Sequence, residues 1–153
     1  MNLSEWALTD KVAIVTGAGR GIGRAIALGL AEAGANVVAA SRTASEIEVT
    51  AENIRALGRR SRAVPTDVLD SRQADNLVKR TLEEFERIDI LVNNAGGGMA
   101  PIGKPIWEIS DEEWRHGIDL ELTGAFFCCR AVGKHMVERK QGKIINRGQT
   151  APH

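Results

Sequence analysis

The chain has 153 residues, of which 43% are hydrophobic and 26% charged, and its 20 basic side chains equal its 20 acidic ones in number. This composition is typical of one globular domain with an adequate core, and the charge balance gives no reason to expect a nucleic acid or a membrane as partner. No apolar stretch approaches the roughly 18 residues of a membrane span, and the N-terminus lacks the pattern of a secretory signal.

The first half of the chain predicts strands and helices in alternation. Short apolar runs predict strands at residues 11–16, 37–40 and 62–64. After the first run, apolar residues recur at helical spacing until Gly34. Ser45 and Glu48 form a capping-box pair that opens a second helix, which Gly58 ends. Pro65 closes the third strand.

The second half continues this alternation. Asp70 or Ser71 can cap a third helix that reaches Phe85, and a fourth strand is predicted at residues 88–92. A loop rich in glycine and proline then occupies residues 93–109.

Another capping box, Ser110 with Glu113, opens the longest helical pattern, which extends to about Lys140, and residues 143–146 predict a fifth strand. Unbroken apolar strands are typical of a parallel sheet between helical layers, and right-handed crossovers favour a doubly wound α/β sheet. We expect one three-layer domain over residues 1–153 with the strand order 3-2-1-4-5.

Neither the cysteines nor the densest basic run forms a recognisable site. Cys128 and Cys129 are adjacent, a spacing that suits neither a metal site nor a disulfide framework. The run Arg59-Arg60-Ser61-Arg62 is interpreted as a solvated loop. We therefore expect a reducing, cytoplasmic setting, with no metal.

The turn after the first predicted strand, Thr-Gly-Ala-Gly-Arg-Gly-Ile-Gly at residues 16–23, is the most informative stretch. Gly17 can take the tight turn, Gly21 lets the backbone approach a phosphate, and Gly23 lets the helix pack near the sheet. Free N–H groups at the helix start would bind a pyrophosphate, which the helix dipole also favours. A turn without a ligand is the alternative. The spacing differs from a P-loop and from G-x-G-x-x-G.

A second unusual loop, Asn93-Asn94-Ala95-Gly96, follows the fourth predicted strand. In the expected sheet the first and fourth strands are neighbours where the order reverses, and a ligand crevice opens at their carboxyl ends. Gly17 and Asn94 each follow one of these strands, so both loops converge on the expected site. An Asx-type turn is the alternative interpretation of the second loop.

The spacing G-x-x-x-G-x-G after Thr16 resembles the short-chain dehydrogenase/reductase family. Asp67-Val68, Asn93-Asn94-Ala95-Gly96 and Leu122-Thr123-Gly124 match further motifs of that family in order, and the resemblance extends from about residue 9 to 146. It implies a Rossmann-like fold and hydride transfer between a carbonyl or alcohol and a nicotinamide coenzyme. The positions that it and the loop geometry assign to the coenzyme are Gly17, Arg20, Gly21, Ile22, Gly23, Arg42, Asp67, Val68, Asn94, Ala95 and Gly96.

The end of the second strand predicts NADP rather than NAD. An NAD site normally places an acidic side chain about 20 residues past the glycines, against the ribose hydroxyls. The family's NAD-type Asp falls at Ser41, whereas Arg42 can pair with a 2′-phosphate and Arg20 can add a second positive contact. The alternative is that both arginines are solvated surface residues.

The family resemblance also implies catalysis by Ser, Tyr and Lys, helped by an Asn. The Asn position is Glu121 and the Ser position Gln149; the Tyr-x-x-x-Lys segment would follow His153, and the sequence contains no tyrosine. Hydride transfer to or from a carbonyl needs a proton donor or acceptor. Structural or surface roles are the simpler interpretation for the remaining polar candidates Glu121, His116, His135 and Asp119.

We therefore assign no catalytic residue and expect, from the resemblance, an NADP-dependent short-chain oxidoreductase that is inactive as this chain, which supplies the coenzyme half and lacks the acid–base half. A nucleotide-binding remnant or pseudoenzyme is the alternative, and the Asn93–Gly96 motif with Arg42 argues against another Rossmann-like enzyme such as a methyltransferase. The polar tail from Arg147 onward suggests an interruption of the reading frame near that residue.

An incomplete sheet has consequences for its surface. We expect residues 143–146 to form an exposed edge, which favours unwanted pairing. Apolar side chains of the long helix would lack a cover, namely Phe126, Phe127 and Val132. We therefore predict self-association. The substrate is not identified, and an apolar wall is the most that residues 97–107 suggest, through Met99, Pro101, Ile102 and Ile106.

Overall fold

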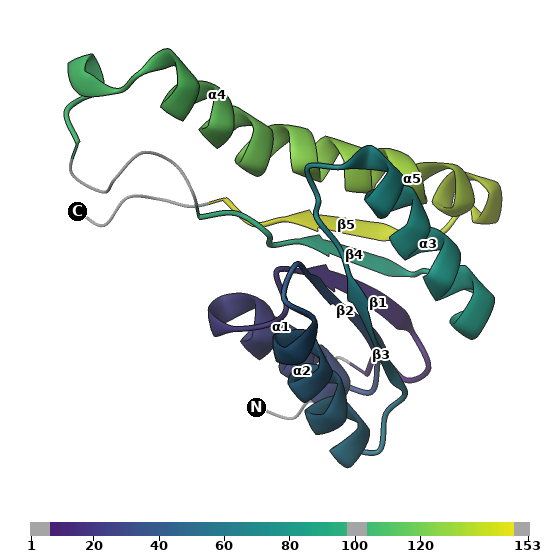
Figure 1. Ribbon diagram of the computed structural model, residues 1–153. Helices are drawn as coiled ribbons and strands as arrows, with labels where there is room; N and C mark the ends of the chain where they lie inside the picture. Colours follow the sequence, from purple (N-terminus) through teal and green to yellow (C-terminus); the bar gives the residue numbers. More distant parts are fainter. Residues whose placement is uncertain (1–6, 98–103, 149–153) are drawn as a thin grey trace.

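The computed structural model, which describes residues 7–97 and 104–148, contains one parallel five-stranded sheet in the order β3-β2-β1-β4-β5 (Figure 1). The strands are β1 (Val12–Thr16), β2 (Asn36–Ser41), β3 (Ser61–Pro65), β4 (Ile90–Asn93) and β5 (Lys143–Asn146). Every pair of neighbouring strands is parallel. The predicted doubly wound α/β fold and its strand order are confirmed.

Helices cover both faces of this sheet (Figure 1). The helices of the described residues are α1 (Gly21–Glu32), α2 (Ala44–Ala56), α3 (Ser71–Phe85), α4 (Asp111–Ile118) and α5 (Gly124–Arg139), with short 3-10 and π turns at Ile106–Glu108 and Asp119–Thr123. Buried side chains of α1 and α2 pack on one face, and those of α3 and α5 pack on the other. The result is a three-layer arrangement.

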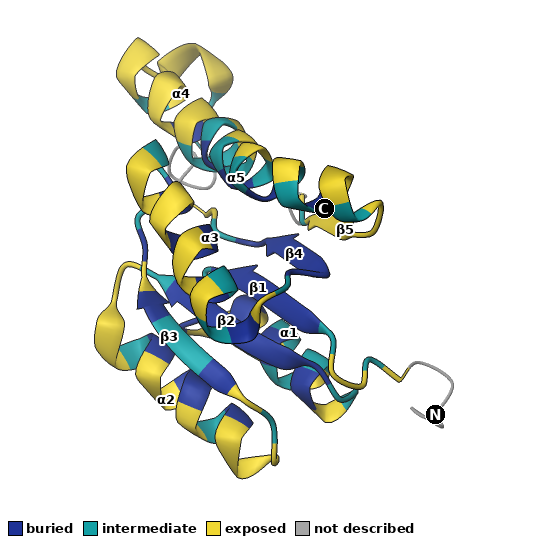
Figure 2. Ribbon diagram, turned by 90° about the vertical axis from the view of Figure 1, so that its right-hand side faces the viewer, coloured by how far each residue is buried: buried dark blue, intermediate teal, exposed yellow. Residues whose placement is uncertain are grey.

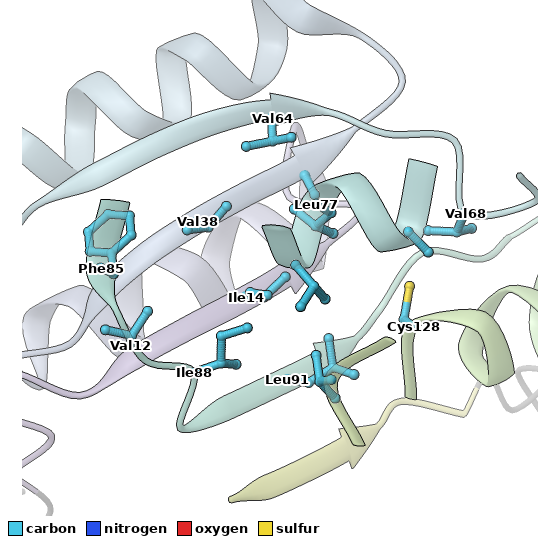
Figure 3. Packing of buried hydrophobic residues seen from close by; sticks show 14 of the residues in the cluster. Val12, Ile14, Val38, Val64, Val68, Leu77, Phe85, Ile88, Leu91 and Cys128 are labelled. Carbon is cyan, nitrogen blue, oxygen red and sulfur yellow. The ribbon is translucent and has the colours of Figure 1, made fainter. Parts of the chain in front are cut away.

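Alternation along β1 shows why the strand is apolar throughout. Val12 and Ile14 belong to the core beneath α3 and α5, whereas Ala13 and Val15 belong to the core beneath α1 and α2. Figure 3 shows the first of these cores, where Ile14 lies among side chains from β2, α3 and β4. Successive residues of a strand point to opposite faces, so a strand between two helical layers needs an apolar residue at every position.

Two of the three predicted helix starts are confirmed and one is wrong. Asp70 accepts the amide of Arg72 at 3.0 Å, and the reciprocal bonds of Ser110 and Glu113 form a complete capping box. By contrast, α2 begins at Ala44, after Thr43, so the expected box lies inside the helix. Glu48 of that pair instead binds Arg55, at 2.7 Å. The S-x-x-E pattern occurs within helices too, and only backbone geometry identifies the cap.

The ends of β3 and α5 also differ from expectation. Pro65 is the last residue of β3 rather than the residue that closes it, and the amide of Thr66 makes the next bond to the carbonyl of Ser41, at 2.8 Å. Since β3 is an edge strand, a missing N–H is tolerated there. Lys140, in a left-handed conformation with φ of 53°, ends α5 before Gly142 is reached.

The basic run at residues 59–62 is only in part the solvated loop that was expected: Arg59 and Arg60 precede β3 without regular structure and Arg60 is exposed, whereas Ser61 is buried. Arg59 bonds to Asp10 at 2.9 Å, Arg60 stacks over the Phe85 ring, and Arg62 bonds to Glu84 at 2.6 Å. Ser61 and Arg62 already belong to β3. Local composition indicated exposure, but each guanidinium has a partner that is distant in sequence.

β5 forms the other edge of the sheet, and all four of its residues are exposed (Figure 2). The expectation for the long helix is only partly correct. Phe126 is 54% exposed, but Val132 is fully buried in the core shared with α3, and Phe127 packs against that core. The face of α5 that carries Val132 is therefore covered by elements that precede it in the chain.

Candidate functional site

A buried polar network joins the ends of β1 and β4. The Thr16 hydroxyl accepts the amides of Asn94 and Ala95, each at 3.0 Å, and donates to the carbonyl of Val92 at 3.4 Å. The Asn94 side-chain amide donates back to the carbonyls of Thr16, at 3.1 Å, and Gly17, at 3.3 Å. The two loops that the sequence singled out are thus bonded to one another at the point where the strand order reverses.

Glycine is present at the positions of the first loop for different structural reasons. Gly17 and Gly21 adopt left-handed φ values of 64° and 53°, which other residues adopt only with strain. Gly23 has an ordinary φ, but a Cβ atom there would overlap the carbonyl of Gly17. A Cβ atom at Gly21 would meet nothing within 4 Å. Gly17 and Gly23 therefore satisfy internal packing, whereas Gly21 borders open space.

The N-terminus of α1 begins beside this open space. Arg20 occupies the N-cap position in an extended conformation and provides no side-chain acceptor for the first turn. The first amides of a helix have no partner within the helix, and the helix dipole makes this end positive. The start of α1 therefore offers unpaired N–H groups to an anion in the cleft.

A cleft of about 620 Å³ lies at the carboxyl ends of the strands. It brings together all eleven residues that the sequence assigned to a coenzyme, Gly17, Arg20, Gly21, Ile22, Gly23, Arg42, Asp67, Val68, Asn94, Ala95 and Gly96. The other residues that line the cleft were not assigned to the coenzyme from the sequence; they are Gly19, Ser41, Thr43, Glu46, Thr66, Leu69, Gly97, His116, Leu120 and Arg147. Apart from Gly19, which belongs to the glycine motif, and Ser41, which follows the second strand, these positions carry no motif, and the folding of the chain brings them to the cleft.

The β2 end of the cleft contains both signs of charge and one unpaired hydroxyl. Arg42 is exposed and belongs to none of the ion pairs among the described residues. The Ser41 hydroxyl is buried without a hydrogen-bond partner. Glu46 lies nearby, since a Cβ atom on Gly19 would meet its Oε2 at 2.8 Å and the Ser41 Oγ at 3.1 Å.

At the β3 end, Asp67 and Val68 form a small turn. The Asp67 carboxylate accepts the amide of Leu69 at 3.0 Å, and the Asp67 amide donates to Gln73 at 2.8 Å. Val68 is buried and packs on Gly124, where a Cβ atom would lie 2.9 Å from it. This contact explains why the helix following the π turn carries a glycine there.

Glu121 positions the second loop. Its Oε1 accepts the amide of Gly97 at 2.6 Å, and a Cβ atom on Gly96 would lie 2.8 Å from both carboxylate oxygens. The residue sits in the π turn Asp119–Thr123, a helix irregularity that often accompanies functional sites. Its carboxylate is engaged with the backbone of the loop, in agreement with the structural interpretation.

The other polar candidates have mixed outcomes. Asp119 accepts the hydroxyl of Thr123 at 3.2 Å, and His135 Nε2 accepts the amide of Ile88 at 3.2 Å, so both have structural partners. His116 is exposed, as expected, yet it also lines the cleft. Ile106 is 76% exposed and does not line the cleft. The remaining expectations fall outside the described residues, namely Met99, Pro101, Ile102 and Gln149.

The described residues contain neither a reactive thiol at Cys128 nor a cluster of metal ligands. Burial, together with the neighbouring Cys129, raises the pKa of the Cys128 thiol to about 11, which keeps it protonated at neutral pH. Within residues 7–97 and 104–148, no three metal-ligating side chains gather in one place, and no helix is long and apolar enough to cross a membrane.

Comparisons with known proteins give one consistent result. The family model for short chain dehydrogenases matches residues 11–151. A 3-oxoacyl-[acyl-carrier-protein] reductase from Synechocystis is 48% identical over 143 residues, covering 92% of this chain and 56% of that protein. The chain therefore spans only a little over half the length of this relative.

Solved structures agree with the sequence relatives. A metagenomic short-chain oxidoreductase in complex with NADP is 35% identical with a TM-score of 0.85, covering 94% of this chain and 64% of that one. A 7α-hydroxysteroid dehydrogenase in complex with NADH and 7-oxoglycochenodeoxycholic acid is 33% identical with a TM-score of 0.85, covering 94% and 55%. These two neighbours contain different nicotinamide coenzymes.

Proposed function

Because this chain belongs to the short-chain dehydrogenase/reductase family, we propose that its cleft binds NADP(H) and forms the coenzyme half of a carbonyl–alcohol oxidoreductase. The observation that carries the proposal is the junction of Thr16 and Asn94, which holds an open helix N-terminus beside a cleft of about 620 Å³. The coenzyme would supply the hydride. The protein's own residues would bind and orient it.

Each part of the cleft suits one part of a dinucleotide. The free amides at the start of α1, from Gly21 to Gly23, would hold the pyrophosphate because no side chain occupies the space beside Gly21. Asp67 and Val68 match the family's Asp-Val pair and would border the adenine at the β3 end of the cleft. Asn94, Ala95 and Gly96 would contact the nicotinamide half, since they continue from β4 on the other side of β1.

The residues after β2 favour the phosphorylated coenzyme. The position that would carry an acid in an NAD site is Ser41, whose buried hydroxyl lacks a partner and can donate to a phosphate oxygen. Arg42 adds a guanidinium, the group best suited to a phosphate. Glu46 opposes this preference, but the hydroxyl and guanidinium give the 2′-phosphate two direct contacts.

Direct binding measurements test the proposal. We expect isothermal titration of the purified chain to give a lower Kd for NADPH than for NADH, with stoichiometry near one. Tighter binding of NADH would contradict the NADP assignment, and the absence of heat and of a fluorescence change with either coenzyme would contradict the binding function altogether.

We further propose that these 153 residues bind the coenzyme without completing the reaction. The carboxylate of Glu121 is engaged by Gly97, and the sequence has no tyrosine to donate a proton to a substrate oxygen. A binding remnant or pseudoenzyme is the second candidate function. Oxidation of NADPH with any member of a ketone and aldehyde panel, above the rate without protein, would contradict this part of the proposal.

A further inference from the structure

Arg147 lies in the cleft although no motif assigned it there. It follows β5 directly, and its amide extends the sheet by donating to the carbonyl of Asn93 at 3.0 Å. Its side chain crosses toward the end of β4, where Nη1 donates to Asn94 Oδ1 at 3.4 Å. The backbone of Arg147 is therefore fixed by the sheet, and its guanidinium is directed from β5 toward the middle of the cleft.

A single amide group separates this guanidinium from the glycine loop. The oxygen of the Asn94 side chain meets Arg147, and the nitrogen of the same side chain donates to the carbonyl of Gly17 at 3.3 Å. Asn94 itself is buried and is held by Thr16. Arg147 thus lies one side chain away from the loop that precedes α1, and both line the same cleft.

The charge on Arg147 has no counter-charge in the described part of the chain. Ion pairs there engage other arginines, but none includes Arg147. Its bond to Asn94 is long, and it uses one of the five N–H donors of a guanidinium. The side chain is half-buried, so its charge is partly desolvated and attracts an anion in the cleft more strongly than a fully exposed one.

We propose that Arg147 binds the pyrophosphate of the nicotinamide coenzyme, together with the N-terminus of α1. This inference rests on the proposed function and names an additional coenzyme-binding residue for it. The helix start offers N–H groups and about half a unit of positive charge, whereas a pyrophosphate carries two negative charges. A guanidinium in the same cleft supplies the remaining positive charge and a fork that matches phosphate oxygens.

Coenzyme fragments distinguish this role from the alternatives. NADPH, NADP⁺ and 2′-AMP are titrated into wild-type protein, Arg147→Met, Arg147→Lys and Arg80→Met. The last variant removes one positive charge from an exposed position of α3 outside the cleft. 2′-AMP carries the 2′-phosphate but no pyrophosphate. We expect Arg147→Met to raise the Kd of NADPH and NADP⁺ alike by about tenfold, and to leave the Kd of 2′-AMP within twofold of wild type.

The other variants and added salt sharpen the result. Arg147→Lys should recover part of the loss because it retains the charge but not the fork, and Arg80→Met should bind all three ligands as wild type does. The affinity of Arg147→Met for NADPH should also depend less on salt than that of wild type. Thermal unfolding followed by circular dichroism confirms that each variant is folded, and Arg147→Lys carries the test if the methionine variant is not.

Three outcomes would overturn the inference. An unchanged Kd of NADPH in Arg147→Met would mean that the guanidinium makes no phosphate contact. Equal weakening of 2′-AMP would indicate general damage to the cleft. A change limited to NADP⁺ would show that Arg147 acts on the charged nicotinamide ring instead. Absence of coenzyme binding by the wild-type protein would contradict the proposed function itself, a result separate from these.

Discussion

The hydroxyl of Thr16 accepts the backbone amide of Asn94 at 3.0 Å, although the two residues are 78 positions apart in sequence. The bond joins the ends of the neighbouring strands β1 and β4. The same oxygen accepts the amide of Ala95 at an equal distance. One hydroxyl therefore satisfies two amides at the point where the cleft opens. Because buried donors without acceptors are costly, this oxygen stabilises the shape of the site as well as the fold.

Replacing Thr16 by valine keeps the volume and removes the acceptor. We expect Thr16→Val to lower the free energy of unfolding by about 2–3 kcal/mol, because two amides lose their partner. Urea denaturation followed by circular dichroism measures the change. Thr16→Ser, which keeps the hydroxyl, should lose less than half as much. Equal losses in the two variants would show that the methyl group, and not the hydroxyl, stabilises the junction.

Two glycines of α1 give a matched pair of alanine substitutions. A Cβ atom at Gly23 would overlap the Gly17 carbonyl and the Asn94 amide, whereas one at Gly29 would meet nothing within 4 Å. We expect Gly23→Ala to destabilise the protein and to weaken NADPH binding at least tenfold. Gly29→Ala should raise stability by up to about 1 kcal/mol, because alanine favours the helix. Similar melting temperatures for both variants would contradict the proposed close packing.

The coenzyme preference should depend on Arg42. Arg42→Asp removes the proposed phosphate partner and supplies a carboxylate that can accept the ribose hydroxyls, so NADH should then bind more tightly than NADPH. Parallel fluorescence titrations with both coenzymes measure the reversal. Arg80→Asp makes the same charge change outside the cleft and should keep the wild-type order. A retained preference for NADPH in Arg42→Asp would move the 2′-phosphate site elsewhere.

The buried carboxylate of Asp89 predicts a dependence of stability on pH. Burial alone would raise the pKa of Asp89, but hydrogen bonds from Arg87 and Val12 and the charges of Arg87 and Arg139 together hold this pKa below its usual range. The stabilisation is therefore complete above the unfolded-state pKa of about 3.9 and is lost as the pH falls through the lower folded-state value.

Asp89→Asn tests this dependence. At pH 7 the variant should be less stable than wild type by about 3 kcal/mol, because Arg87 and Arg139 lose a buried partner. Below pH 4 the difference should shrink as the wild-type carboxylate becomes protonated. Urea unfolding at several pH values between 2 and 7 measures both stabilities, and a difference that does not vary with pH would contradict the assignment to Asp89.

The exposed edge strand β5 predicts self-association of the isolated chain. Ile144 and Ile145 are 40% and 50% exposed beside unpaired backbone groups, and such an edge is a template for pairing with another chain. We expect sedimentation velocity to detect species larger than a monomer, and Ile145→Lys to reduce them. Val49→Lys, at an exposed apolar position of α2, is the control. A monomer at all concentrations would contradict this prediction.

Several parts of the fold could be predicted from local patterns. The apolar runs around Ile14, Val38 and Leu91 indicated strands buried on both faces, and that condition requires helices on each side of a parallel sheet. The tight turn expected at Gly17 is present as a left-handed φ, and the close packing of the helix expected at Gly23 is present as its contact with the Gly17 carbonyl. Asp70 and Ser110 were correct as caps because their bonds reach only two or three residues along the chain.

Other features depend on partners that are far apart in sequence. Val132 is covered by α3, and Arg59 and Arg62 are only half-buried beside distant acidic partners, so local composition predicted full exposure of these residues wrongly. The helix cap at Thr43 and the π turn that carries Glu121 reflect backbone geometry that the residue pattern does not specify.

The sequence by itself determined the kind of sheet and the glycine loop that lines the cleft, because periodicity and glycine placement act over a few residues. Only the tertiary structure decided that Arg147 and His116 face the same cleft as Gly21, and that Ser41 offers an unpaired hydroxyl there. These residues come from separate strands and helices, and their proximity follows from parallel strands that all end at one edge of the sheet.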